Sequence, residues 1–178
     1  DWSSDVCSSD LVELGDSFTT APRRWSAGTA YMRLGIVREQ SKNSSGAELA
    51  YGKAIGLMMP DPDGGARPPN VVGDQAYCRQ RFAWLLTERS AFTEAKRILE
   101  KAADEVRPHI GSGPQNRPSK EALSSILRQL SNVHQRTGDE SAAAHLRLEA
   151  QRLDGPGFRG PGGPPPFGGP KGPPPKRS

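Results

Sequence analysis

The chain has 178 residues and a formal net charge of +4, a length that suits one modest domain. Residues 155–178 carry four basic side chains and no acidic one, so residues 1–154 are neutral overall, and we expect no basic nucleic-acid-binding face on the folded part. No run in the sequence approaches the roughly 18 apolar residues of a membrane-spanning helix, which excludes such a span from this chain.

Residues 1–11 are rich in serine and aspartate and show no apolar periodicity, so they have nothing to bury. They also lack the basic start and continuous apolar core of a signal peptide. The segment resembles the in-frame translation of a sequencing-library adapter, which implies that Trp2 and Cys7 belong to no native site. The chain would then be a C-terminal fragment of a longer protein, and genuine protein sequence would begin near Val12. An ordinary disordered N-terminus is the alternative, and residues 12–21 form a junction in either case.

Three segments of the sequence align without gaps at a constant step of 48 residues. The positions that recur are a large apolar residue followed by a small one, then a small residue twelve positions later and another seven after that. Alanines seven residues apart share a helix face and let a neighbouring helix approach closely. The aligned positions are Leu34-Gly35, Phe82-Ala83 and Leu130-Ser131, then Ala47, Ala95 and Ala143, then Ala54, Ala102 and Ala150.

Each segment reads as two helices joined by a turn, which gives units at 22–60, 70–108 and 118–153. The first helices are expected at 22–40, 70–88 and 118–136. Strands with alternating patterns are absent from the sequence, so the predicted fold class is all-α.

The second helix of the middle unit has the clearest amphipathic pattern. Its apolar stripe consists of Phe92, Ala95, Ile98, Leu99, Ala102 and Val106. Its charged residues are expected on a solvated face, with Lys96–Glu100 and Lys101–Glu105 paired four positions apart. Ser90 is expected to cap this helix at its N-terminus, as Asp139 does for the corresponding helix of the third unit.

The unit resembles a tetratricopeptide repeat, in which aromatic, Leu-Gly and Ala positions recur at fixed offsets. The first unit matches through Tyr31, Leu34, Gly35, Ala47, Tyr51 and Ala54. The resemblance implies an α-solenoid of three units over residues 22–154. The step of 48 exceeds the family's usual 34, which predicts lengthened helices joined by Pro/Gly-rich loops of about ten residues. Such lengthened repeats resemble those at the C-termini of large bacterial regulatory proteins, including planctomycete serine/threonine kinases.

The resemblance also implies that the first helices line a concave face that binds a peptide or a helix of another protein. The partner-binding residues carried over are Met32, Ile36, Tyr77, Trp84, Arg128, Asn132 and Arg136, with Glu39, Gln40, Gln80, Glu88 and Gln135 beside them. Trp84 would supply contact area, and Arg128 or Arg136 would hold a carboxylate. A core position for Trp84 and solvated positions for the two arginines are the alternatives.

No constellation in the sequence indicates catalysis, a cofactor or a metal. His134 and His145 could approach each other, but no cysteine or carboxylate completes a ligand set with them. Cys78 is the one thiol outside residues 1–11, so no disulfide framework is expected and a reducing, cytoplasmic location fits. We therefore expect a protein-binding scaffold and not an enzyme. The alternatives are the regulatory C-terminal region of an enzyme, such as a bacterial kinase whose catalytic domain is missing, and a structural spacer.

The last segment, residues 155–178, contains eight glycines and nine prolines. Proline removes hydrogen-bond donors and glycine raises the entropic cost of ordering, so a disordered tail is predicted. Its two Pro-Pro-Pro runs favour polyproline II conformation, but no basic residue lies at the spacing that common proline-recognition motifs need. Its four cations predict a weak, salt-sensitive attraction to anionic surfaces.

Overall fold

The computed structural model describes residues 20–60, 67–111 and 117–154. The described residues form six α-helices and one short 3-10 helix, and they contain no strand, which confirms the predicted all-α class for this part of the chain. The elements are α2 (Ala21–Gln40), α3 (Ser44–Leu57), α4 (Pro69–Glu88), α5 (Phe92–Val106), η1 (Arg107–His109), α6 (Arg117–Arg136) and α7 (Glu140–Asp154). The predictions for residues 1–11 and for the tail at 155–178 lie outside the described residues.

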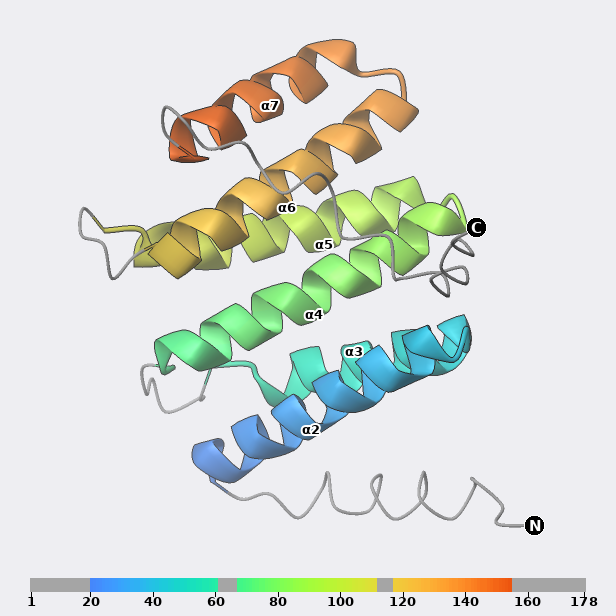
Figure 1. Ribbon diagram of the computed structural model, residues 1–178, viewed down its shortest axis with the longest axis vertical. Helices are drawn as coiled ribbons and strands as arrows, with labels where there is room; N and C mark the ends of the chain where they lie inside the picture. The colour runs from blue at the N-terminus through green and yellow to red at the C-terminus, as the bar shows by residue number, and fades with distance from the viewer. Residues whose placement is uncertain (1–19, 61–66, 112–116, 155–178) are drawn as a thin grey trace, which may run out of the picture.

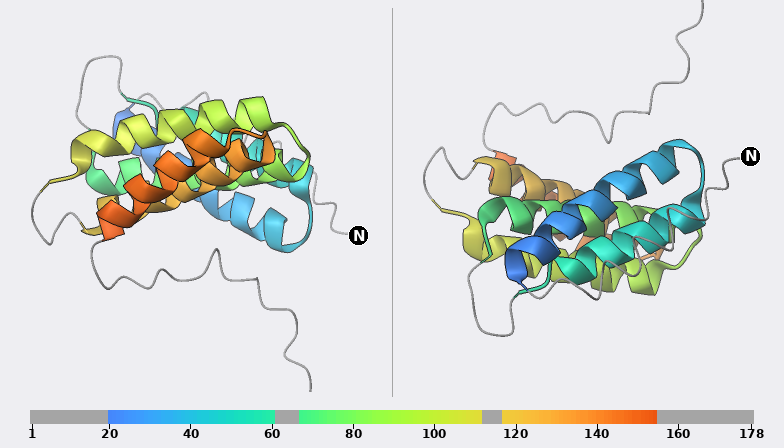
Figure 2. Two further views of the ribbon diagram at one scale, coloured as in Figure 1. Left: turned by 90° about the horizontal axis from the view of Figure 1, so that it is seen from above. Right: turned by 90° about the horizontal axis from the view of Figure 1, so that it is seen from below.

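The helices are arranged as three antiparallel pairs, α2 with α3, α4 with α5, and α6 with α7. The pairs follow one another along the longest axis of the molecule (Figure 1), and α3 contacts α4 as α5 contacts α6. Seen from below, α2 and α3 lie side by side and join at one end (Figure 2). The first helices begin at residues 21, 69 and 117 and the second helices at 44, 92 and 140, so both sets advance by the same step of 48.

The recurring small residues lie where helices approach most closely. All six recurring alanines are fully buried, at 0% exposure: Ala47, Ala54, Ala95, Ala102, Ala143 and Ala150. Gly35 plays a similar part in the first pair, because a Cβ built there would lie 2.6 Å from the Tyr51 ring. The expectation that small side chains allow close packing within each pair is therefore confirmed.

The turn inside each pair is closed by a residue with left-handed backbone. These residues are Lys42 (φ 61°), Ser90 (φ 64°) and Gly138 (φ 85°), again at steps of 48. In the middle pair the Ser90 N–H donates to the Thr87 carbonyl at 3.1 Å and the Ala91 N–H to the Leu86 carbonyl at 2.8 Å. This is the Schellman pattern, which satisfies carbonyls at a helix C-terminus.

The capping predictions had mixed outcomes. Ser90 was expected to cap α5, and this is wrong, because its left-handed backbone ends α4 and Ala91 precedes α5 without a side-chain cap. Asp139 caps α7 as expected, since its Oδ1 accepts from the Ala142 N–H at 3.1 Å. That N–H, and after it the His134 ring, hold the pKa of Asp139 below its usual range. Asn43 caps α3 in the same way, accepting from the Gly46 N–H at 2.9 Å.

We expect glycine at the left-handed positions to stabilise the protein. Replacing Lys42 or Ser90 with glycine removes a Cβ from unfavourable backbone and should raise the free energy of unfolding by up to about 1 kcal/mol. Gly138→Ala should lower it by a similar amount, although a Cβ there meets no atom within 4 Å. Urea denaturation followed by circular dichroism measures each change. Stabilisation by Gly138→Ala would contradict the assignment.

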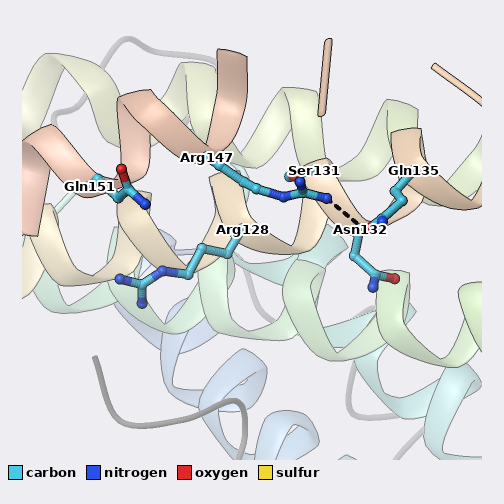
Figure 3. A pocket seen from close by; sticks show the side chains of 6 residues that line it. All are labelled: Arg128, Ser131, Asn132, Gln135, Arg147 and Gln151. Atoms are coloured by element: carbon cyan, nitrogen blue, oxygen red, sulfur yellow. Dashed lines mark hydrogen bonds between the residues drawn. The ribbon is translucent and has the colours of Figure 1, made fainter. Parts of the chain in front are cut away.

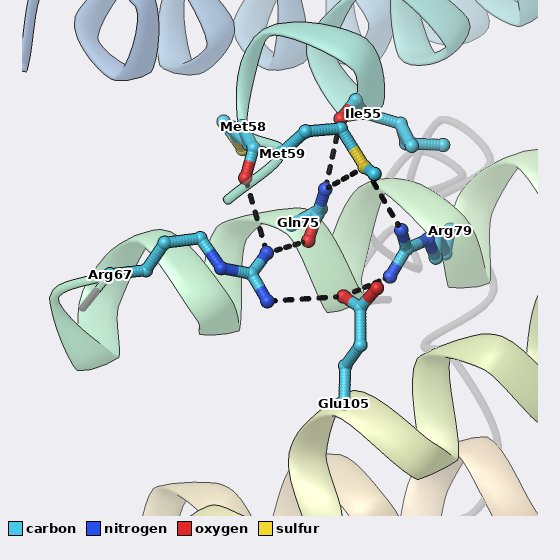
Figure 4. Close-up of polar contacts among 7 residues, drawn as sticks. All are labelled: Ile55, Met58, Met59, Arg67, Gln75, Arg79 and Glu105. Carbon is cyan, nitrogen blue, oxygen red and sulfur yellow. Dashed lines mark hydrogen bonds and ion pairs between the residues drawn. The ribbon is translucent and has the colours of Figure 1, made fainter. Parts of the chain in front are cut away.

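A cluster of polar side chains joins the first two pairs beside the Pro/Gly-rich connection (Figure 4). Arg67 donates to the Met58 carbonyl at 3.1 Å and also to the side chain of Gln75. Gln75 is fully buried and donates to the Ile55 carbonyl at 2.9 Å. These hydrogen bonds between buried groups hold the C-terminus of α3 against the start of α4.

The carboxylate of Glu105 on α5 completes this cluster. It pairs with Arg79, whose side chain is 3% exposed, and lies 3.5 Å from the Arg67 guanidinium. In Figure 4 the two arginines approach it from opposite sides. Glu105 was expected on a solvated face paired with Lys101, and this is wrong. Its partners come from residues 26 and 38 positions earlier, which helical spacing within α5 does not reveal.

Candidate partner-binding face

The first helices of the three pairs, α2, α4 and α6, form a continuous series of contacts. Between α2 and α4, the Thr29 hydroxyl donates to Asp74 at 3.1 Å. Between α4 and α6, the Gln80 amide donates to the Ser125 hydroxyl at 2.9 Å, and Gln129 donates to the Gln80 carbonyl at 3.0 Å. The residues carried over from the tetratricopeptide pattern lie on these three helices, and Gln80 is engaged in holding two of them together.

The α2 and α4 part of this face is apolar. Met32, Ile36 and Trp84 are half-buried and pack against the cluster that contains Tyr51, Cys78 and Leu85. Tyr77 on α4 is 37% exposed and is one of four large hydrophobic residues that the described chain leaves open to solvent. Trp84 is thus neither a fully buried core residue nor a free surface residue, and it keeps part of its area available for contact.

A nearly buried ion pair lies beside Trp84. Arg81 bonds both carboxylate oxygens of Glu39, with Nε 3.1 Å from Oε2, and the side chains are 12% and 9% exposed. The guanidinium carbon also lies 5.1 Å from the centre of the Trp84 ring, a cation–π contact. The Tyr51 hydroxyl donates to the same carboxylate at 2.9 Å. Glu39 was expected to line the face, but it instead joins α2, α3 and α4.

The α6 part of the face is polar, and its arginines are paired. Arg128 forms an ion pair with Asp154 at the end of α7. Arg136 donates to the Thr87 carbonyl at 3.3 Å and lies over the Phe92 ring at 5.0 Å, so it contacts the second pair. Asn132 is exposed. A ligand carboxylate would have to compete with Asp154 for Arg128.

An open groove of about 330 Å³ lies between α6 and α7 (Figure 3). Arg147 of α7 reaches across it and donates to Gln135 of α6 at 2.6 Å. Every side chain that lines the groove is polar: Arg128, Ser131, Asn132, Gln135, Arg147 and Gln151. The sequence did not single out Ser131 or Gln151 for this groove. The step of 48 relates Ser131 to buried Gly35 and Ala83, and Gln151 to half-buried Ile55 and buried Ala103.

The two histidines considered as metal ligands, His134 and His145, have different surroundings. His134 Nδ1 lies 3.0 Å from the Asp139 carboxylate that caps α7, while His145 is exposed. Within residues 20–60, 67–111 and 117–154, no three His, Cys, Asp or Glu side chains are gathered as a metal site. None of the described helices combines the length and the apolar character that crossing a membrane requires.

Cys78 is expected to react slowly as long as the protein is folded. It is fully buried, and burial, followed by the nearby Asp74, raises the pKa of its thiol to about 12. In a Cys7→Ser chain, iodoacetamide at pH 8 should alkylate Cys78 at least about 1,000-fold more slowly in the folded than in the urea-unfolded protein. Mass spectrometry over time gives both rates. Similar rates in the two states would show that this part of α4 is open.

Comparison of the chain with protein-family models, with curated protein sequences and with solved structures gives no match. The assignment of a function therefore depends on the geometry described above and on the pattern in the sequence.

Proposed function

We propose that this chain is a tetratricopeptide-like α-solenoid that binds a peptide or a helix of another protein on the face formed by α2, α4 and α6. The observation that carries the proposal is the series of contacts between these three helices, with half-buried Met32, Ile36 and Trp84 and exposed Tyr77 on them. Partly exposed aromatic side chains on a rigid support are the usual anchors of protein interfaces. The buried free thiol of Cys78 suits a reducing compartment, and we place the protein in the cytoplasm.

The chemistry of the face favours a ligand with two features. An aliphatic or aromatic anchor would lie against Trp84 and Tyr77, whose exposed area it would cover. Asn132 lies one unit further along and offers a donor and an acceptor for the ligand backbone. Because Arg128 and Arg136 already have protein partners, we assign most of the affinity to the apolar half.

Selection from a phage-displayed library of random peptides tests this function. The best peptide should lose at least about tenfold in affinity in the Trp84→Ala/Arg128→Ala chain. Asn132→Ala should weaken binding without changing the thermal unfolding midpoint, because its side chain is exposed. Tyr77→Ala should also weaken binding, since it removes the exposed part of an aromatic anchor. Arg97→Ala, an exposed position on α5, is the matched control. Selected peptides that bind all four variants like the parent would refute the assignment of the face.

A further inference from the structure

The first helices α4 and α6 each carry a stripe of residues turned toward the preceding helix pair. On α4, Cys78 and Leu85 are 0% and 4% exposed and belong to a cluster with Tyr51 of α3. On α6, the residues 48 positions later are Ile126 and Val133, at 0% and 1% exposure, in a cluster that includes residues of α5. Both interfaces between consecutive pairs therefore use the same two positions of the first helix.

The corresponding residues of α2 are Ala30 and Val37. Leu34 between them is half-buried and packs against the cluster that contains Tyr51. Ala30 and Val37 are apolar like their counterparts, yet Ala30 is exposed and Val37 is 59% exposed. The stripe on α2 is thus built like the stripes that α4 and α6 bury. We propose that the surface formed by Ala30 and Val37 docks a further helix pair of the same repeat type. The inference rests on the solenoid arrangement of the proposed function.

The opposite end of the described stack has a different chemistry. In the first two pairs, the groove that receives the next first helix contains Gly35 and Tyr51, then Ala83 and Leu99, all of them buried. At the same positions the third pair has Ser131 and Arg147, and its groove is polar throughout. A terminal repeat needs a polar outer face. Among the described residues, the third pair has this polar character, and we therefore assign the docking surface to α2 and not to the groove between α6 and α7.

The interfaces between the described helix pairs indicate which kind of partner would fit on the α2 surface. A partner that continues them offers a second helix with an alanine like Ala54 or Ala102 and a large apolar residue like Tyr51 or Leu99. A second copy of this chain stacked end to end would offer α7, where the large residue is Arg147. Burying that guanidinium against Val37 would leave a charge without a carboxylate partner and would be costly. End-to-end stacking of copies is therefore disfavoured, and the occupant that we assign is another pair of this repeat.

A variant chain with residues 21–68 duplicated in tandem before residue 21 provides a defined probe. The added pair should stabilise the protein, with a fall of at least about tenfold in the equilibrium constant for unfolding. Val37→Asp should change that constant less than about twofold in the 178-residue chain and at least about tenfold in the extended chain. The matched control carries residues 69–116 inserted after residue 164. The added pair then begins 48 residues after the start of α6 at Arg117, and this chain should gain no stability.

The inference would be overturned by no gain in stability from the N-terminal pair, by an equal gain from the C-terminal pair, or by an equal effect of Val37→Asp in both chains. Self-association of the 178-residue chain in analytical ultracentrifugation, abolished by Val37→Asp, would also overturn it, because the occupant would then be a second copy. Peptide binding is a separate readout. A stabilising added pair together with failed peptide selection would refute the binding function and leave this inference standing.

Discussion

Replacing Glu105 with alanine is expected to destabilise the protein by about 3 kcal/mol. The substitution removes the carboxylate shared by Arg79 and Arg67, whose side chains are 3% and 9% exposed. Two guanidinium groups would remain in a site from which most water is excluded, and such uncompensated charges are far more costly than the loss of a surface ion pair. Urea denaturation of the variant measures the change in the free energy of unfolding.

Glu100→Ala is the matched control for that experiment, since it lies on the same helix. Its side chain is 49% exposed and its partner Lys96 lies 3.9 Å away, so its loss should cost no more than about 0.5 kcal/mol. Glu105→Gln retains hydrogen-bond acceptors without the charge and should fall between the two. Equal effects of Glu105→Ala and Glu100→Ala would show that the cluster does not hold the first two helix pairs together.

Gly35→Ala is expected to destabilise the protein by about 2 kcal/mol, although alanine is the better helix former. The new Cβ would lie 2.6 and 2.7 Å from two carbons of the Tyr51 ring. Tyr51 cannot move aside easily, because it is fully buried and its hydroxyl is bonded to Glu39. Either α2 must move away from α3 or the ring must break that hydrogen bond, and both changes lower the melting temperature measured by calorimetry.

At two other helical glycines, substitution by alanine is expected to raise the free energy of unfolding instead of lowering it. A Cβ at Gly52 in α3 or Gly73 in α4 meets no atom within 4 Å, so alanine there should stabilise the protein by up to about 1 kcal/mol through helix propensity. The three substitutions change the same atoms in helices and differ only in their surroundings. Stabilisation by Gly35→Ala would mean that α2 and α3 are not packed as closely as described.

The sequence was sufficient to predict the helices because their signals are local and repeated. The first helices begin within one residue of the expected positions, and each alanine chosen from the step of 48 is fully buried. For a residue whose role depends on partners far away in the chain, no local pattern predicts that role. Helical spacing predicts a solvated Glu105 and a lining Glu39, and both predictions fail because the arginine partners lie on other helices. Ser90 has the composition of an N-cap but the backbone of a helix C-terminus.

At the candidate face, too, contacts between helices could not be predicted from the sequence. The helical pattern placed Met32, Trp84 and Asn132 on first helices, but it could not show that Trp84 is half-buried beneath Arg81 or that Arg128 is occupied by Asp154. Those contacts join residues from different helices and depend on how the pairs pack. The step of 48 applied to identity marks Arg147, which stands where Tyr51 and Leu99 stand in the earlier pairs. Val37 is apolar like Leu85 and Val133 and differs from them only in its exposure, which the sequence does not show.

The most direct test of the proposed function is nuclear magnetic resonance mapping of a selected peptide on the ¹⁵N-labelled protein. We predict that the largest shift changes will occur at the backbone amides of Met32, Ile36, Tyr77 and Trp84 and at the side-chain amide of Asn132, with small changes on α3, α5 and α7. Changes concentrated on α3, α5 and α7, or a failure to select any peptide, would contradict the account.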